Sequence, residues 1–70
     1  MDEDRLRLIK LIEHWIEHNN EHGNRFSEEA HKAEKLGLKD VAEELYNASK
    51  ASGMVSEKLS NALKLLRESK

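Results

Sequence analysis

Apolar and small residues recur at alternating spacings of three and four through both halves of the chain. This spacing places them on one face of a helix, and a sustained repeat is typical of helices that pack lengthwise on one another. The 70 residues include no Pro and only three Gly, with abundant Glu, Lys, Leu and Ala, which favour helix. No run alternates with the two-residue period of a strand, so the sequence predicts an all-α fold.

The first stripe predicts a helix from about residue 4 to about residue 36. The acidic run Asp2–Asp4 offers a cap and a favourable charge at the positive end of the helix dipole. Gly23 could instead end one helix, with Ser27 capping another, but a loop usually resets the repeat and here the spacing continues. The members of this stripe are Leu8, Ile12, Trp15, Asn19, His22, Phe26, Ala30, Ala33 and Gly37.

A turn over residues 37–40 is predicted next. Gly37 suits the left-handed position that follows many helices, and Asp40 resembles an N-cap with Glu43 three residues later. The second stripe then predicts a helix from about residue 41 to about residue 67, again with a glycine, Gly53, inside it. Its members are Val41, Leu45, Ala48, Ser52, Val55, Leu59, Ala62 and Leu66.

Two long helices joined by a tight turn predict an antiparallel hairpin, with residues 1–70 as a single domain. Folding the chain about the turn places Trp15 near Ala62 and Gly23 opposite Gly53, so that small residues oppose large ones or each other. The alternative is a compact monomer in which the helices break at both glycines and form four short helices.

The open end of this hairpin carries more apolar surface than one neighbouring helix can cover. Apolar residues there occupy more than half of the circumference of the first helix, and so large an apolar area on a small protein marks an interface. A chain this short with no Cys also needs a partner copy or a non-thiolate metal for stability. We therefore expect a homodimer that forms a four-helix bundle, with a tetramer as the alternative. The apolar residues are Leu6, Leu8, Ile9, Leu11, Ile12, Trp15 and Ile16.

Composition argues against several classes of function. The net charge is −2 with both signs interspersed, so there is no basic field for nucleic acid. No window approaches the roughly 18 apolar residues of a membrane span, and the acidic start does not fit a signal peptide. No nucleophile stands beside a base, and no glycine-rich loop suits phosphate. We expect a cytoplasmic protein that is not an enzyme, and a protein partner besides its own copy stays open.

His14, His18 and His22 are the one indication of chemistry in the sequence. A spacing of four residues lets two imidazoles converge on one metal from a helix, and neutral imidazole suits Ni and Zn. All three cannot reach one ion easily, because the outer pair is about 12 Å apart along the axis. We predict an Ni or Zn site that uses His18 with His22, or His14 with His18. The remaining ligands would come from Glu17, Glu21, His31 or the second chain of a dimer. The alternative has His22 as an interior residue paired with Asn19, and no metal.

Two other polar features have simpler interpretations. Asn19 is predicted to lie on the apolar seam, where a buried Asn often fixes register or oligomeric state. Glu28 and His31 match the Glu-x-x-His pattern of di-iron bundles, but they point away from the stripe, and the second stripe supplies no carboxylate. We interpret that pair as a solvated face.

The run from Glu13 to His22, EHWIEHNNEH, followed by Phe26 and by AEKLGL over 33–38, resembles a small helical domain of anaerobic archaea and bacteria. That domain also occurs behind a small β-domain similar to the CooT-type nickel-binding accessory proteins of carbon monoxide dehydrogenase maturation. The resemblance covers most of the chain and implies a role in metal handling, with the histidine run matching in full. This sequence has no such β-domain, so a nickel role carried there does not transfer. Gly23 stands where a helix-favouring residue is expected.

Overall fold

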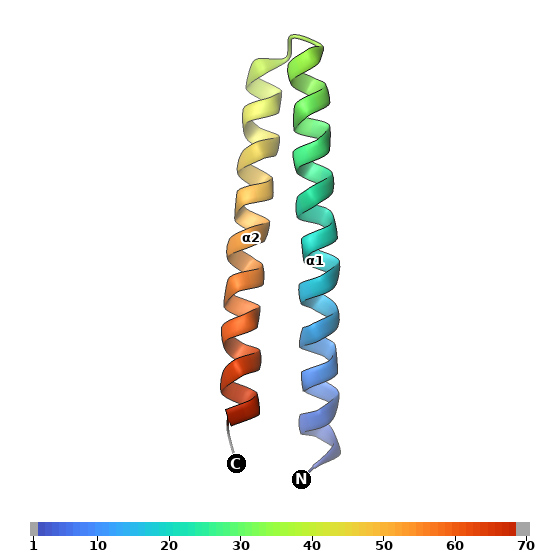
Figure 1. Cartoon of the computed structure of the whole chain (residues 1–70), viewed down its shortest axis with the longest axis vertical. Coiled ribbons are helices and arrows are strands. Elements are labelled where there is room, and N and C mark those ends of the chain that lie inside the picture. Colours follow the sequence, from blue (N-terminus) through green and yellow to red (C-terminus); the bar gives the residue numbers. More distant parts are fainter. Residues whose placement is uncertain (1, 69–70) are drawn as a thin grey trace.

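A computed structural model describes residues 2–68 as two long helices joined by a tight turn (Figure 1). Helix α1 runs over Glu3–Lys35 and helix α2 over Lys39–Glu68. No strand occurs within the described residues. The start of α1 and the end of α2 lie at the same end of the hairpin, opposite the turn (Figure 1). The predicted hairpin of two long helices is confirmed, and neither Gly23 nor Gly53 interrupts its helix.

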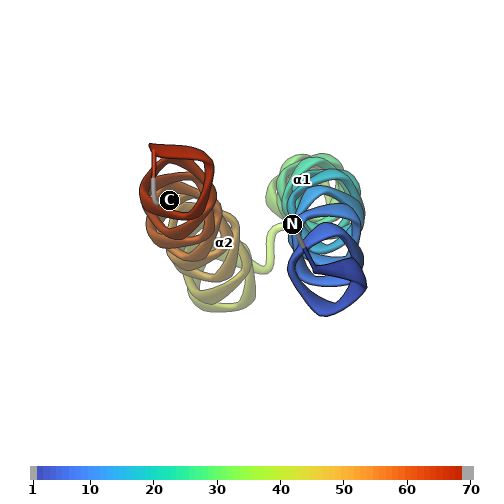
Figure 2. The ribbon, with the colours of Figure 1, turned by 90° about the horizontal axis from the view of Figure 1, so that it is seen from below.

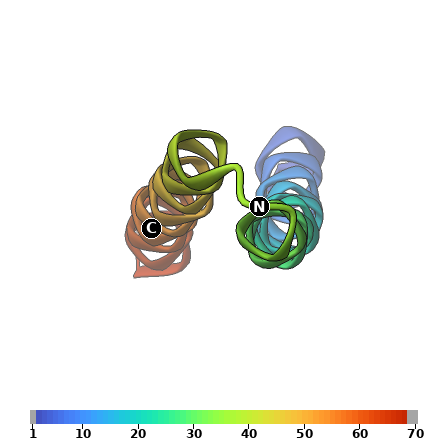
Figure 3. The same ribbon diagram turned by 90° about the horizontal axis from the view of Figure 1, so that it is seen from above.

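The hairpin is a rod that extends 54 × 14 × 10 Å along its principal axes. Views along the rod show the two helices side by side and wrapping around each other (Figures 2 and 3). Its radius of gyration is 16.0 Å, whereas a compact domain of this length has about 11 Å. Within residues 2–68, neither helix contains the long apolar run that crossing a bilayer requires.

Asp2 caps helix α1 as the sequence predicts. Its Oδ1 accepts a hydrogen bond of 2.7 Å from the backbone N–H of Arg5, one of the amides that has no partner inside the helix. Glu3 and Asp4 follow in the first turn, where a negative charge is favoured by the helix dipole.

The turn closes α1 with two backbone hydrogen bonds. Gly37 has φ +81°, and its N–H donates to the carbonyl of Glu34 over 2.9 Å. The N–H of Leu38 donates to the carbonyl of Ala33 over 3.0 Å, which completes a Schellman motif. The left-handed glycine predicted at position 37 is confirmed.

Helix α2 begins earlier than the sequence pattern predicts. The N–H of Ala42 donates to the carbonyl of Leu38 over 2.9 Å, so Leu38 accepts the first helical hydrogen bond. The prediction that Asp40 is the N-cap is therefore wrong, because α2 already includes Lys39. Asp40 lies in the first turn, where its carboxylate still favours the positive helix end.

Small and medium side chains make the contact between the helices. The most buried are Ala30, Ala42, Ile12, Ala33 and Leu63, and no large side chain in the described residues is fully enclosed. The stripe that packs against the other helix comprises Ile9, Ile12, Ile16, Asn19, Gly23, Phe26, Ala30 and Ala33 on α1, and Ala42, Leu45, Ser49, Ser52, Ser56, Leu59, Leu63 and Leu66 on α2.

The observed stripes differ by one position from part of the predicted ones. Ile9, Ile16 and Gly23 pack toward α2 where the prediction had their preceding residues. The first helix carries two adjacent apolar stripes, and the spacing of residues alone does not show which one meets the partner helix. The predicted seam residues that are exposed instead are Leu8, Trp15 and His22 on α1, and Val41, Val55 and Ala62 on α2.

Gly23 lies where α1 and α2 come very close together. A Cβ added at Gly23 would lie 3.1 Å from the Cβ of Ser52 and 3.7 Å from the carbonyl oxygen of Ser49. A Cβ added at Gly53 would meet nothing within 4 Å. The prediction that Gly23 faces Gly53 is therefore wrong by one residue along α2, since the absent side chain of Gly23 accommodates Ser52.

Candidate metal centre

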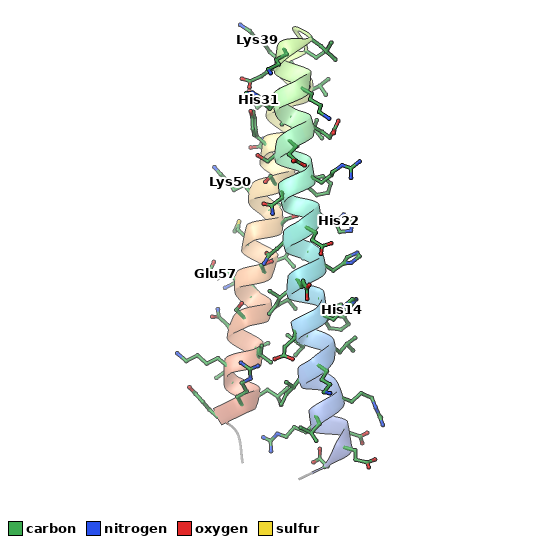
Figure 4. All side chains as sticks on the ribbon, turned by 45° about the vertical axis from the view of Figure 1, so that its right-hand side comes forward. His14, His22, His31, Lys39, Lys50 and Glu57 are labelled. Carbon is green, nitrogen blue, oxygen red and sulfur yellow. The ribbon has the colours of Figure 1, made fainter. Side chains whose placement is uncertain are left out.

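Helix α1 carries His14, His18 and His22 along one side, near the middle of the rod. Figure 4 shows His14 and His22 on one side of α1 and His31 on the other. The ring centroids of His14 and His18 are 5.8 Å apart, and those of His18 and His22 are 4.5 Å apart. The continuous helix thus produces the strip that the spacing predicts.

His18 and His22 form a close pair. Their Nε2 atoms are 2.9 Å apart, so one ring donates its N–H to the lone pair of the other. Two metal–nitrogen bonds of about 2.0–2.1 Å at a right angle span about 2.9 Å, and at a tetrahedral angle about 3.3 Å. The separation of the two Nε2 atoms is therefore close to the span of two ligands on one divalent ion. To bind such an ion, both rings would have to carry their proton on Nδ1 and rotate until both Nε2 lone pairs point at it.

The pair borders an apolar groove between the two helices, with a volume of about 430 Å³. The ring of His22 stacks on Phe26 at a centroid distance of 6.2 Å, which holds the imidazole on one side. Both imidazoles stay exposed to solvent. The groove is lined by Trp15, His18, Asn19, His22, Val55 and Leu59.

A polar layer crosses the hairpin directly beneath the pair. The amide Nδ2 of Asn19 donates to the carbonyl of Ser52 over 2.6 Å and to the hydroxyl of Ser56 over 2.9 Å. The hydroxyl of Ser56 donates to Oδ1 of Asn20 over 2.6 Å. No buried side-chain polar atom of the described residues lacks a partner. The layer fixes α1 against α2 at the height of the histidine pair.

The sequence prediction missed much of this layer. Ser49 and Ser56 were not among the predicted seam residues. The hydroxyl of Ser56 nevertheless bonds the side chains of Asn19 and Asn20. The hydroxyl of Ser49 donates to the carbonyl of Gly23 over 2.8 Å. Serines at 49, 52 and 56 repeat at the same three-and-four spacing as the apolar stripe. That spacing, together with Asn19 on the facing helix, was the feature of the sequence that could have predicted the polar layer.

The two edges of the hairpin differ in character. The polar edge is formed on α1 by Glu13, Asn20 and Glu34, which are separated by multiples of seven residues. Each of these side chains bonds a side chain of α2. Glu13 pairs with Arg67, and Glu34 accepts a hydrogen bond of 2.9 Å from the hydroxyl of Tyr46. This bond and the charge of Glu34 raise the pKa of Tyr46 above its ordinary value. The opposite, apolar edge comprises Leu8, Leu11, Trp15, His18 and His22 with Val55 and Leu59 of α2.

One chain brings two imidazoles together at this site. Within residues 2–68, no three side chains of His, Cys, Asp or Glu gather in a set that could hold a metal ion. His14 lies one turn away from the close pair, and His31 is exposed beside Glu34 with Nδ1 3.7 Å from Oε1. Glu28, like His31, is exposed, in agreement with a solvated face. The described residues thus bring two imidazoles together and place no third such side chain beside them.

A protein-family model described as "Domain of unknown function (DUF8180)" matches residues 8–66. The match takes in the histidine strip, the polar layer and the turn. Neither the curated proteins nor the solved structures include one that matches this chain.

Proposed function

The chain belongs to the DUF8180 family, and we propose that it is a self-associating helical module that binds a transition metal, Ni²⁺ or Zn²⁺. The ligands are His18 and His22, with His14 as the third candidate. The role we propose is that of a carrier or accessory module rather than an enzyme.

The distance of 2.9 Å between the two Nε2 atoms carries the metal proposal. A spacing of one helical turn brings two histidines near each other, but it does not require their Nε2 atoms to meet, since water can satisfy each ring. Here the rings meet at their Nε2 atoms, and Phe26 supports one of them. The polar layer beneath fixes the backbone that carries both, which lowers the entropic cost of arranging two ligands.

Self-association is supported by the exposed surface of the single hairpin. It exposes 5642 Å², whereas a compact protein of this mass exposes about 4,500 Å². The excess of about 1,100 Å² is comparable to the roughly 800 Å² that each partner buries in a stable dimer. The exposed apolar side chains include Leu8, Leu11 and Trp15 on the apolar edge. A second hairpin on this edge would complete a four-helix bundle.

Isothermal titration of metal-free protein with NiCl₂ and ZnCl₂ tests the metal proposal. The wild type should bind, and His18→Ala and His22→Ala should each weaken binding by at least about tenfold because each removes one of two ligands. His31→Ala is the matched control, since this histidine is exposed on α1 without facing the pair. Equal affinity in all four proteins would contradict the proposal.

Sedimentation equilibrium tests the self-association. Leu11→Lys places a charge on the apolar edge and should shift the protein toward monomer. Met54→Lys is the control, because Met54 is an exposed apolar residue that does not belong to the apolar edge. A wild type that sediments as a monomer at all concentrations would contradict the dimer.

A second candidate is an oligomerisation or protein-interaction module with no metal. The observation that favours it is the complete hydrogen bonding of Asn19 and Ser56, which fixes the register without a ligand. This candidate predicts a dimer whose mass and melting temperature are the same with and without chelator.

A further inference from the structure

The histidine pair lies at the middle of the hairpin and on its apolar edge at once. Helix α1 runs over Glu3–Lys35, so His18 and His22 flank its midpoint. They line the same groove as Trp15, Val55 and Leu59. The histidine pair, which needs further ligands to hold a metal, therefore lies on the same surface that we propose contacts a second copy of the chain.

Two-fold symmetry decides what this position means. Most homodimers have a two-fold axis, and residues close to that axis meet their own copies. Two hairpins that overlap along their full length can be antiparallel or parallel. In the antiparallel dimer the two-fold axis is perpendicular to the rods and passes through their mid-length. In the parallel dimer the axis runs between the rods along their whole length. In both arrangements, residues at mid-length on the contact edge approach the same residues of the partner.

We propose that His18 and His22 of two copies form one four-imidazole metal site at the two-fold axis of the dimer. This inference rests on the proposed function, in which the pair binds metal and the apolar edge self-associates. Zinc in structural sites takes four ligands, and a single chain gathers two within residues 2–68. The second copy supplies the missing pair, and the apolar residues around it exclude water from the completed site.

Placement of the site at the axis links metal binding to dimerisation. A ligand that binds the dimer but only weakly binds the monomer shifts the equilibrium toward the dimer. Metal should therefore tighten the dimer, and dilution should release the metal. The same linkage makes the protein a reversible carrier, because separation of the copies leaves each with two ligands.

The test combines stoichiometry with mass. Metal-free wild type is titrated with NiCl₂ and ZnCl₂ by calorimetry, and sedimentation equilibrium is run with and without each metal. We expect one metal ion for two chains and a dimer dissociation constant lowered by at least about tenfold. His18→Ala and His22→Ala should lose this metal effect while they keep the metal-free dimer, and His31→Ala should behave as wild type.

Each other outcome has a distinct meaning. One metal ion for each chain, with no change in the dissociation constant, would overturn the shared site and leave the proposed metal binding standing. Absence of metal binding with an intact dimer would overturn both the shared site and the metal proposal. Circular dichroism of the variants checks that helix content is unchanged, which is expected because both histidines are exposed.

Discussion

The side-chain amide of Asn19 donates to the backbone carbonyl of Ser52 over 2.6 Å, from the middle of α1 to the middle of α2. The carbonyl oxygen of Ser52 is inside α2, where it accepts a backbone hydrogen bond of the helix. The bond from Asn19 is the second that this oxygen accepts, and its two lone pairs allow both. Sliding α1 along α2 would break this bond and the bond of the same amide to the hydroxyl of Ser56. The contact therefore selects one register among the several that an apolar stripe allows.

Asn19→Ala should destabilise the hairpin by about 1–3 kcal/mol. The substitution removes the donor to Ser52 and Ser56 and leaves a gap beside the Ser56 hydroxyl. Urea denaturation followed by circular dichroism, at fixed protein concentration, measures the change. Asn47→Ala is the matched control, since Asn47 is an exposed asparagine of α2. Equal free energies of unfolding for the two variants would show that the layer contributes nothing to stability.

The architecture could be predicted from the sequence because two repeats of three and four continue across Gly23 and Gly53. The pairing of the helices could not. The stripe through Leu8 and Trp15 and the neighbouring stripe through Ile9 and Ile16 are both apolar, and they share Ile12 and Asn19. What decides between them is the close approach of two backbones at Gly23, and spacing within one helix carries no information about that approach.

The candidate site was partly predictable for a similar reason. A spacing of four residues on a helix brings His18 close to His22, so the pair follows from local geometry. The groove beside them depends on which residues of α2 lie opposite, and this follows from the register. Whether a second copy completes the site depends on a surface between molecules, which no pattern within one helix specifies.

Gly23→Ala and Gly53→Ala should have different effects on stability. At Gly53 a methyl group meets nothing within 4 Å, so alanine should stabilise α2 by about 0.5–1 kcal/mol through its helix propensity. At Gly23 the same methyl would lie 3.1 Å from the Cβ of Ser52, and the two helices must move apart to admit it. The gain in propensity is then offset by lost packing.

The matched glycines make this comparison internally controlled. Both are inside long helices, and both substitutions add one methyl group. Thermal denaturation should rank the melting temperatures as Gly53→Ala above wild type and Gly23→Ala clearly below Gly53→Ala. An equal increase for both variants would mean that the helices do not approach closely at residue 23.

Gly37→Ala should weaken the turn. Gly37 has φ +81°, a conformation that costs an L-residue with a Cβ about 1–2 kcal/mol. The backbone bonds of Gly37 to Glu34 and of Leu38 to Ala33 hold this geometry, so the chain cannot relax without losing them. Chemical denaturation should show a loss of this size. A stability equal to that of wild type would indicate that the turn adopts another conformation.

Titration of Tyr46 should report the contact between α1 and α2 near the turn. The hydrogen bond to Glu34 raises the pKa of Tyr46, so in the folded protein the phenol should ionise at higher pH than in the unfolded chain. The contribution of this contact to stability is therefore fully present below the ordinary pKa of about 10 and is lost as the pH rises through the raised pKa.

Ultraviolet absorbance of tyrosinate measures this ionisation without ambiguity, because Tyr46 is the single tyrosine of the chain. Glu34→Gln removes the negative charge that opposes ionisation and should return the pKa toward its ordinary value. Glu44→Gln removes an equal charge from an exposed position of α2 that makes no contact with the Tyr46 hydroxyl, and should leave the titration unchanged. If both variants titrate as wild type does, Tyr46 does not bond Glu34 in solution, and the polar edge is held by the pairs of Glu13 with Arg67 and of Asn20 with Ser56.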